Sequence, residues 1–367
     1  MDKVRGVLLG SFIGDALSMP VHWYYNQKSI FEDYNGWITK FESPRPEHPS
    51  AIMNVANTGG QGRGNQTGDI IGGVILHDKK QFWGKSKVHY HQGMSAGTNT
   101  LNTHVHRVLL RNLTNQSGYS PISFLDDYIK FMTTPNTHPD TYAESYHREF
   151  FKNYRAGKPP MECAGAEGHD TASMGGLVSL PALILYLYYK KSPRSDIIQT
   201  CLAHISLTHQ SHDLSKFARV YLDAFLDFLE YPTHPVPVPE IHRVLDRACK
   251  SLPEPFDVLR LIREYPTIGD PLQDAKVVGR MFSPACYISD SLPSLFYFAA
   301  KYAEAGIVPA LLANTNVGGE NCHRGSVLGA LLGAALGDAG INPQFIDGLT
   351  EIKPIQSEID AFIKVLE

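Results

Sequence analysis

The sequence has few cysteines, no strongly basic segment and no long apolar run. Its five cysteines are scattered over 367 residues, and none has C-x-x-C spacing. This argues against a disulfide scaffold or a structural zinc site and predicts reduced thiols in a cytoplasmic protein. The formal net charge is −4 with no Lys/Arg-rich run, so nucleic acid is not an expected partner. The longest apolar run, residues 177–189, is shorter than the roughly 18–20 residues that span a bilayer, and we predict no membrane segment.

Alternation typical of β-strands is also almost absent, whereas helical periodicity runs through most of the chain. Apolar residues recur at three- and four-residue spacing in 100–113, 121–133, 174–190, 194–207, 213–229, 238–250, 286–304 and 323–337. The breaks between these segments are rich in Pro, Gly and Asn, and none is long enough for an interdomain linker. The sequence therefore predicts an all-α fold in which residues 1–367 form a single multi-helix bundle.

Two segments near opposite ends of the chain share the pattern G-x-L-L-G-x-x-x-G-D-A. They are GVLLGSFIGDAL at 6–17 and GALLGAALGDAG at 329–340. Glycines four residues apart lie on one face of a helix, where another backbone can approach closely. We predict that the two segments form helices packed against each other at the centre of the bundle, and that the loops at their N-termini are held rigidly.

The segment VRGVLLGSFIGDALSMPVHW at 4–23 resembles the N-terminal signature of the ADP-ribosylglycohydrolase family, which includes the dinitrogenase-reductase activating glycohydrolases. Further matches follow in order at 59–69, 174–181, 207–213, 289–298 and 318–340. These matches cover nearly the whole chain. The resemblance implies an all-α domain of the ADP-ribosylglycohydrolase type with a cleft over its central helices.

The resemblance also implies a pair of Mg²⁺ ions, held in the family by a Thr-Asp-Asp-Thr run and a Gly-Asp-x-Asp-Thr run. Here these runs align with GNQT at 64–67 and GGENCH within 318–323, so one of four expected carboxylates remains. Thr67 and Glu320 are the aligned ligands that persist, and Asp69 lies two residues beyond the first run. Amides and a thiol are poor ligands for a hard cation, so the pattern argues against an intact two-Mg²⁺ site. This pattern of residues resembles more closely the divergent branch of the family that contains selenoprotein J and the J-type crystallins.

The segment Glu320, Asn321, Cys322, His323 and Arg324 lies at the predicted N-terminus of a helix, where unpaired N–H groups favour an anion. We expect Glu320 to act in catalysis and Asn321, His323 and Arg324 to contact substrate. A cysteine in this position is expected to have a lowered pKa, which would make Cys322 a candidate nucleophile. The alternative is that Glu320 or Asn321 caps the helix and Cys322 is a small buried residue.

Two other loops carry candidate residues. The segment 59–69 holds five glycines without a Walker or dinucleotide fingerprint, and its expected substrate contacts are Gly62, Gly64, Asn65, Gln66 and Thr67. In the loop at 167–174, His169 is an expected substrate contact, and Asp170 is either an acid/base carboxylate or a helix cap. The H-x-H pairs at 89/91 and 104/106 are more typical of surface or core-edge histidines than of zinc ligands.

The leading hypothesis is hydrolysis of an N- or O-ribosyl bond in a nucleotide-sugar or ADP-ribosylated small-molecule substrate. Glu320 or Asp69 would activate water, and Mg²⁺ would be the cofactor if the metal site is kept. Two alternatives stay open: a catalytically inactive crystallin-like protein or pseudoenzyme, and thiol-dependent chemistry at Cys322. The sequence alone leaves open whether the chain is an enzyme.

Overall fold

The computed structural model describes residues 1–53, 70–168 and 171–367, and this part of the chain contains helices and isolated bridges but no strand. The first group of α-helices comprises α1 (Asp2–Ser18), α2 (Gln27–Asp33), α4 (Ile70–Gly73), α5 (Leu101–Asn115), α6 (Pro121–Thr133), α7 (Ser145–Arg155), α8 (Leu180–Tyr189), α9 (Arg194–Ser206) and α10 (His212–Glu230). The second group comprises α11 (Val238–Lys250), α12 (Val258–Glu264), α13 (Pro271–Asp274), α14 (Ile288–Lys301), α15 (Ile307–Val317), α16 (Asn321–Leu336), α17 (Pro343–Asp347) and α18 (Ile352–Leu366). The predicted all-α fold is confirmed.

Each of the eight segments with helical periodicity contains a helix. The segment at 174–190 is divided into a short 3₁₀ helix, Met174–Leu177, and α8. Pro181 lies in the first turn of α8, where its missing N–H costs no hydrogen bond, so a new helix can begin there.

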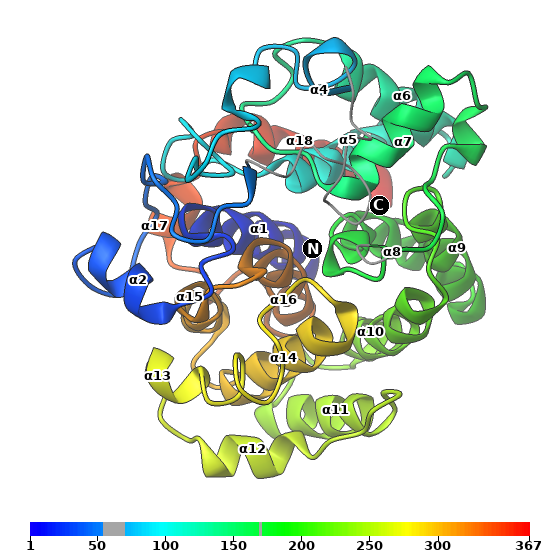
Figure 1. Ribbon diagram of the computed structural model, residues 1–367. Helices are drawn as coiled ribbons and strands as arrows, with labels where there is room; N and C mark the ends of the chain where they lie inside the picture. Colours follow the sequence, from blue (N-terminus) through cyan, green and yellow to red (C-terminus); the bar gives the residue numbers. More distant parts are fainter. Residues whose placement is uncertain (54–69, 169–170) are drawn as a thin grey trace.

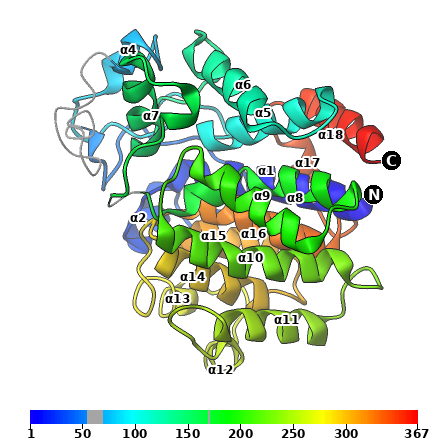
Figure 2. The same ribbon diagram turned by 90° about the vertical axis from the view of Figure 1, so that its right-hand side faces the viewer.

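Helices α1 and α16 lie side by side at the centre of the molecule (Figures 1 and 2). Helices α10, α14 and α15 also contact α16, and α5 packs against α6, α8 and α18. The segment Asp2–Val21 is apolar and long enough to span a membrane, but 94% of its apolar window is buried inside the protein, as in a core helix.

The glycine pattern explains why these two helices meet so closely. A methyl group on Gly10 would lie 2.4 Å from the carbonyl oxygen of Gly329, and one on Gly14 would lie 2.2 Å from that of Gly325. Both distances are shorter than any van der Waals contact, so side chains at these positions would force the helices apart. The predicted packing of the two glycine-striped helices is confirmed.

Asp15 connects this centre to the loop that precedes α5. Its buried carboxylate accepts hydrogen bonds from Asn99 Nδ2 at 2.9 Å, from the Thr100 amide at 2.8 Å and from Thr100 Oγ1 at 2.6 Å. Thr100 is the N-cap residue of α5. The N-terminal end of α5 is thereby fixed against α1, close to the loop that opens α16.

Candidate active site

The loop before α16 is held in place through backbone contacts. The Trp23 amide donates to the Gly319 carbonyl at 2.7 Å, and the Gly319 amide donates to the Tyr24 carbonyl at 2.7 Å. Gly319 has φ 67°, and a methyl group there would lie 2.0 Å from the Pro284 carbonyl oxygen. Both the left-handed backbone and the close approach require glycine. The Gly-Gly pair thus sets the direction in which the next residue, Glu320, enters the protein.

Glu320 is the N-cap residue of α16 and is fully buried. Its Oε1 accepts a hydrogen bond from the His323 amide at 3.3 Å, so the predicted capping role is confirmed. The same oxygen lies 2.9 Å from His22 Nε2 and 3.0 Å from His323 Nδ1. The second oxygen, Oε2, is buried and has no hydrogen-bond partner among the described residues. Such an acceptor is costly to bury, so it points toward a bound water or ligand.

A chain of buried hydrogen bonds continues from His22. His22 Nδ1 and His91 Nε2 are 2.7 Å apart, and His91 Nδ1 and Asp140 Oδ1 are also 2.7 Å apart. Asp140 Oδ2 in turn accepts from the Leu101 amide at 2.7 Å, at the start of α5. Glu320, His22, His91 and Asp140 are therefore connected in this order, each side chain contacting the next.

Glu144 brings a second carboxylate to the site. Its Oε1 lies 3.3 Å from His323 Nε2, and its side chain is 14% exposed, whereas those of His22, Glu320 and His323 are nearly inaccessible. We name these four side chains, His22, Glu144, Glu320 and His323, the Glu320 cluster. Through Glu144 the cluster reaches the surface.

The charges within the site stabilise one another. Burial alone would raise the pKa of Glu320, but the neighbouring His323 and His22 hold it well below its usual range. Burial lowers the pKa of His323, but Glu320 and Glu144 more than offset this and raise it to about 9. Burial lowers the pKa of His22 to about 4. At neutral pH the cluster thus holds an ionised Glu320 beside a protonated His323 and a neutral His22.

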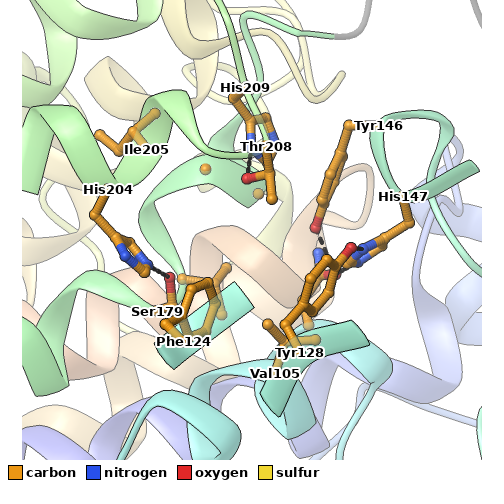
Figure 3. Close-up of a pocket in the computed structure, with 14 residues that line it drawn as sticks. Val105, Phe124, Tyr128, Tyr146, His147, Ser179, His204, Ile205, Thr208 and His209 are labelled. Atoms are coloured by element: carbon orange, nitrogen blue, oxygen red, sulfur yellow. Dashed lines mark hydrogen bonds between the residues drawn. The ribbon is translucent and has the colours of Figure 1, made fainter. Parts of the chain in front are cut away.

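A cavity of about 30 Å³ adjoins the cluster. Figure 3 shows Tyr128, Tyr146 and His147 on one side of it and His204, Thr208 and His209 on the other. Asn102 lines the cavity as well, and its Nδ2 lies 2.5 Å from His323 Nε2. This volume is enough for one or two water molecules. The buried His209 Nε2, which has no partner among the described residues, offers such a water a hydrogen bond.

The sequence profile of the ADP-ribosylglycohydrolase family matches residues 1–367. The chain belongs to this family. A solved structure described as an ADP-ribosylglycohydrolase-related protein complex is similar to it, with a TM-score of 0.58, 17% identity, and coverage of 100% of this chain and 98% of that chain. At this identity the likeness shows the fold, whereas membership in the family supports a glycohydrolase-like function. No curated protein matches the sequence.

Cys322 differs from its expected behaviour. It is fully buried and packs with Met19 and Met94. Burial raises the pKa of its thiol well above the usual range, and the negative charges of Asp15 and Glu320 add to this effect. The expectation of a lowered thiol pKa at this helix N-terminus is therefore wrong, because desolvation and nearby carboxylates outweigh the helix dipole.

Asn321 and Arg324 are bound within the protein rather than exposed in a cleft. Arg324 Nε donates to Asn314 Oδ1 at 2.6 Å and its Nη2 donates to the Gly318 carbonyl at 2.9 Å. Asn321 Nδ2 donates to the Thr315 carbonyl at 3.1 Å. Both side chains are fully buried, and their hydrogen bonds hold the loop at 318–319, which we call the glycine loop, in place. Of the predicted residues at 320–324, Glu320 and His323 are the two that the structure brings together in the cluster.

Several predicted residues lie outside the described residues: Gly62, Gly64, Asn65, Gln66, Thr67, Asp69, His169 and Asp170. Their assigned roles in substrate, metal or proton chemistry stay predictions. Four residues of the site were not predicted from the sequence: His22, His91, Asp140 and Glu144. The H-x-H pair at 89/91 was the available signal. It lies in a turn rather than a strand, so its two rings point to different partners: His91 contacts His22, and His89 contacts the Pro20 carbonyl.

The described residues fit Mg²⁺ poorly. Mg²⁺ favours an octahedral shell of oxygen ligands. Glu320 shares its Oε1 between two imidazoles, and Cys322 offers a thiol in place of an oxygen. Thr67 and Asp69 lie outside the described residues, so Mg²⁺ binding by all three predicted ligands stays a prediction. No step of the reaction proposed below depends on Mg²⁺.

Proposed function

We propose that this protein hydrolyses an N- or O-ribosyl bond in a nucleotide-sugar or ADP-ribosylated substrate, at the Glu320 cluster. The observation that supports this most is the buried, unpartnered Oε2 of Glu320 in a chain of a glycohydrolase family. A carboxylate oxygen in this state can accept a hydrogen bond from water or a ribose hydroxyl and can face the positive charge of a ribosyl transition state.

The reaction assigns a different role to each member of the cluster. Water adds to the anomeric carbon, the bond from that carbon to the leaving nitrogen or oxygen breaks, and the leaving group gains a proton. Glu320, which stays ionised, stabilises the positive charge that develops on the ribosyl ring. Glu144, the partly exposed carboxylate, accepts the proton of the attacking water and returns it to the leaving group, so that the carboxylate is regenerated. Asp69 is the other carboxylate proposed for this proton transfer, on sequence grounds alone.

A second candidate is a protein that binds a ligand, or only fills a structural role, without catalysis. The observation in its favour is the mutual pairing of His22, His91 and Asp140, all nearly inaccessible, because a fully bonded buried network also serves to fix a fold. The resemblance of the motif pattern to the branch of selenoprotein J and the J-type crystallins also favours this candidate. The loss of aligned carboxylates at 64–67 and 322 supports it further.

The two candidates differ in turnover. Purified full-length protein would be incubated with ADP-ribosyl-arginine and with an O-linked ADP-ribosyl peptide, and free ADP-ribose would be measured by chromatography. We expect release from at least one substrate, with and without added Mg²⁺. If no ADP-ribose appears from either substrate at any enzyme concentration, the hydrolase proposal is overturned and the non-catalytic candidate is left.

A further inference from the structure

We propose that the Glu320 cluster is a binding site for one divalent first-row transition-metal ion of the Zn²⁺ type. His22, Glu144, Glu320 and His323 each offer one ligand atom, and these atoms all lie within 4.8 Å of one another. The four side chains come from three separate parts of the chain, which meet only because the glycine loop, the segment after α1 and the segment before α7 are packed together.

The distances agree with ligands arranged around a single ion. Ligand atoms at the 2.0–2.1 Å bond lengths of Zn²⁺ lie about 3.3 Å apart in a tetrahedron. The Glu320 Oε1 to His22 Nε2 distance is 2.9 Å, and the His323 Nε2 to Glu144 Oε1 distance is 3.3 Å. All four ligand atoms lie within 4.8 Å of one another, so those farther apart than about 3.3 Å would have to move closer together to surround an ion.

The donor types select the class of metal. A metal ion that binds His323 must first displace the proton that this residue carries at neutral pH. The resulting two imidazoles and two carboxylates suit Zn²⁺ and other first-row divalent ions, whereas Mg²⁺ and Ca²⁺ favour oxygen alone. The two carboxylates also supply the charge that offsets a dication. A site with this donor set differs in kind from the oxygen-ligated Mg²⁺ pair that the family resemblance implies.

His22 is held by a second side chain, as histidines that bind metals usually are. A histidine that binds metal through one nitrogen usually donates its other N–H to a further acceptor, which fixes the ring and its tautomer. His22 faces the cluster with Nε2 and bonds His91 with Nδ1 at 2.7 Å, and His91 is fixed by Asp140. The unpartnered Glu320 Oε2 is an independent sign that the cluster lacks one partner.

A rival grouping uses His22, His91 and Cys322. In that grouping both nitrogens of His91 are already bonded, one to His22 and one to Asp140. Cys322 is packed between Met19 and Met94, away from solvent. The Glu320 cluster has one partly exposed member, Glu144, on the side from which an ion can enter, whereas all three members of the rival grouping are buried.

A bound ion would occupy Glu320 and Glu144, to which the proposed hydrolysis assigns other roles, so metal binding is tested without reference to turnover and either proposal can fail alone. The full-length protein, freed of metal with a chelator, would be dialysed against Zn²⁺ and in parallel against Mg²⁺, and bound metal would be measured by mass spectrometry. We expect one Zn²⁺ per chain. His22→Gln and Glu320→Gln should abolish stoichiometric binding, and His91→Gln should weaken it about 10–100-fold. His242→Gln, on α11, is the matched control and should bind as the wild type does.

The absorption spectrum with Co²⁺ in place of Zn²⁺ needs no variant, so it remains informative if a substitution prevents folding. Coordination by the Glu320 cluster predicts ligand-field bands without a thiolate-to-cobalt charge-transfer band. A strong charge-transfer band would assign the ion to a cysteine thiolate outside the Glu320 cluster and overturn the proposal. So would a wild-type protein that retains no Zn²⁺, or a folded His22→Gln variant that binds Zn²⁺ as tightly as the wild type.

Discussion

Glu320 has two roles that a single substitution can separate. Its Oε1 caps α16 through the His323 amide, and its charge balances the His323 imidazolium. Glutamine keeps an oxygen for the cap but removes the charge. Because an uncompensated buried charge is left behind, Glu320→Gln should lower the free energy of unfolding by about 3 kcal/mol. Urea denaturation at pH 7 measures this value.

The control for this prediction is Glu304→Gln. Glu304 is an exposed carboxylate outside the site, and its substitution should change the free energy of unfolding by less than about 0.5 kcal/mol. A double variant, Glu320→Gln with His323→Gln, should be less destabilised than the sum of the two single variants, because the first substitution removes the partner of the second. Strictly additive losses would show that the two side chains do not interact.

Asp140 should make the stability of the folded protein depend on pH in the acid range. Burial alone would raise its pKa, but His91 and the Leu101 amide lower it to about 2 from the usual 3.8. A carboxyl group whose pKa is lowered in the folded state contributes stability above pH 4, which is lost as the pH falls toward 2. The contribution is about 2 kcal/mol. The free energy of unfolding, measured by heat or urea, should therefore fall more steeply between pH 5 and pH 2 for the wild type than for Asp140→Asn. Parallel curves would contradict the lowered pKa.

At the scale of elements, the contact between α1 and α16 determines where the site can form. Gly10→Ala places a methyl group 2.4 Å from the Gly329 carbonyl oxygen, so the helices must separate. We expect a loss of about 3 kcal/mol in unfolding free energy, at the upper end of the usual cost of overpacking. Gly118→Ala is the matched control, because a methyl group there meets no atom within 4 Å. Equal stability of the two variants would show that the glycine contact is dispensable.

The sequence located most of the long helices, both those with one apolar face and those buried on all sides, but it missed α7, α15 and α18. Periodicity located α5, α6, α10 and α11, and the repeated glycines located α1 and α16. Helix α15 was missed because both its apolar and its polar residues are buried, among them Asn314 and Asn316. Without a polar face toward water, no contrast marks the helix. Helices α7 and α18 were also missed, although one face of each is buried and the other exposed.

The candidate site could be predicted only in part for a related reason. The family resemblance located Glu320 and His323, because they lie in one short motif. His22, His91 and Asp140 come from separate loops, and no spacing in the sequence connects them. Cys322 shows the limit of local reasoning, since its position at a helix N-terminus favours a low pKa while its burial in the fold raises it.

At the scale of the whole molecule, the family fold is kept while the residues at 319–323 differ from the run that the family resemblance implies. The fold is shared with a solved structure of 17% identity, so its packing tolerates wide substitution. If the site binds a ribosyl nucleotide, ADP-ribose should stabilise the folded protein, by about 2.7 kcal/mol at a concentration 100 times its Kd. Thermal unfolding with and without ADP-ribose measures this. Arginine alone serves as the ligand control, and an unchanged Tm with ADP-ribose would contradict binding of the nucleotide.

The central claim is that ribosyl hydrolysis depends on the Glu320 cluster. The most direct measurement is the single-turnover rate of ADP-ribose release by folded wild-type, Glu320→Gln and Glu304→Gln proteins on the substrate that the wild type cleaves fastest. The account predicts a loss of at least about 100-fold for Glu320→Gln and an unchanged rate for Glu304→Gln. A Glu320→Gln protein as fast as the wild type would contradict it and place the reaction elsewhere in the molecule.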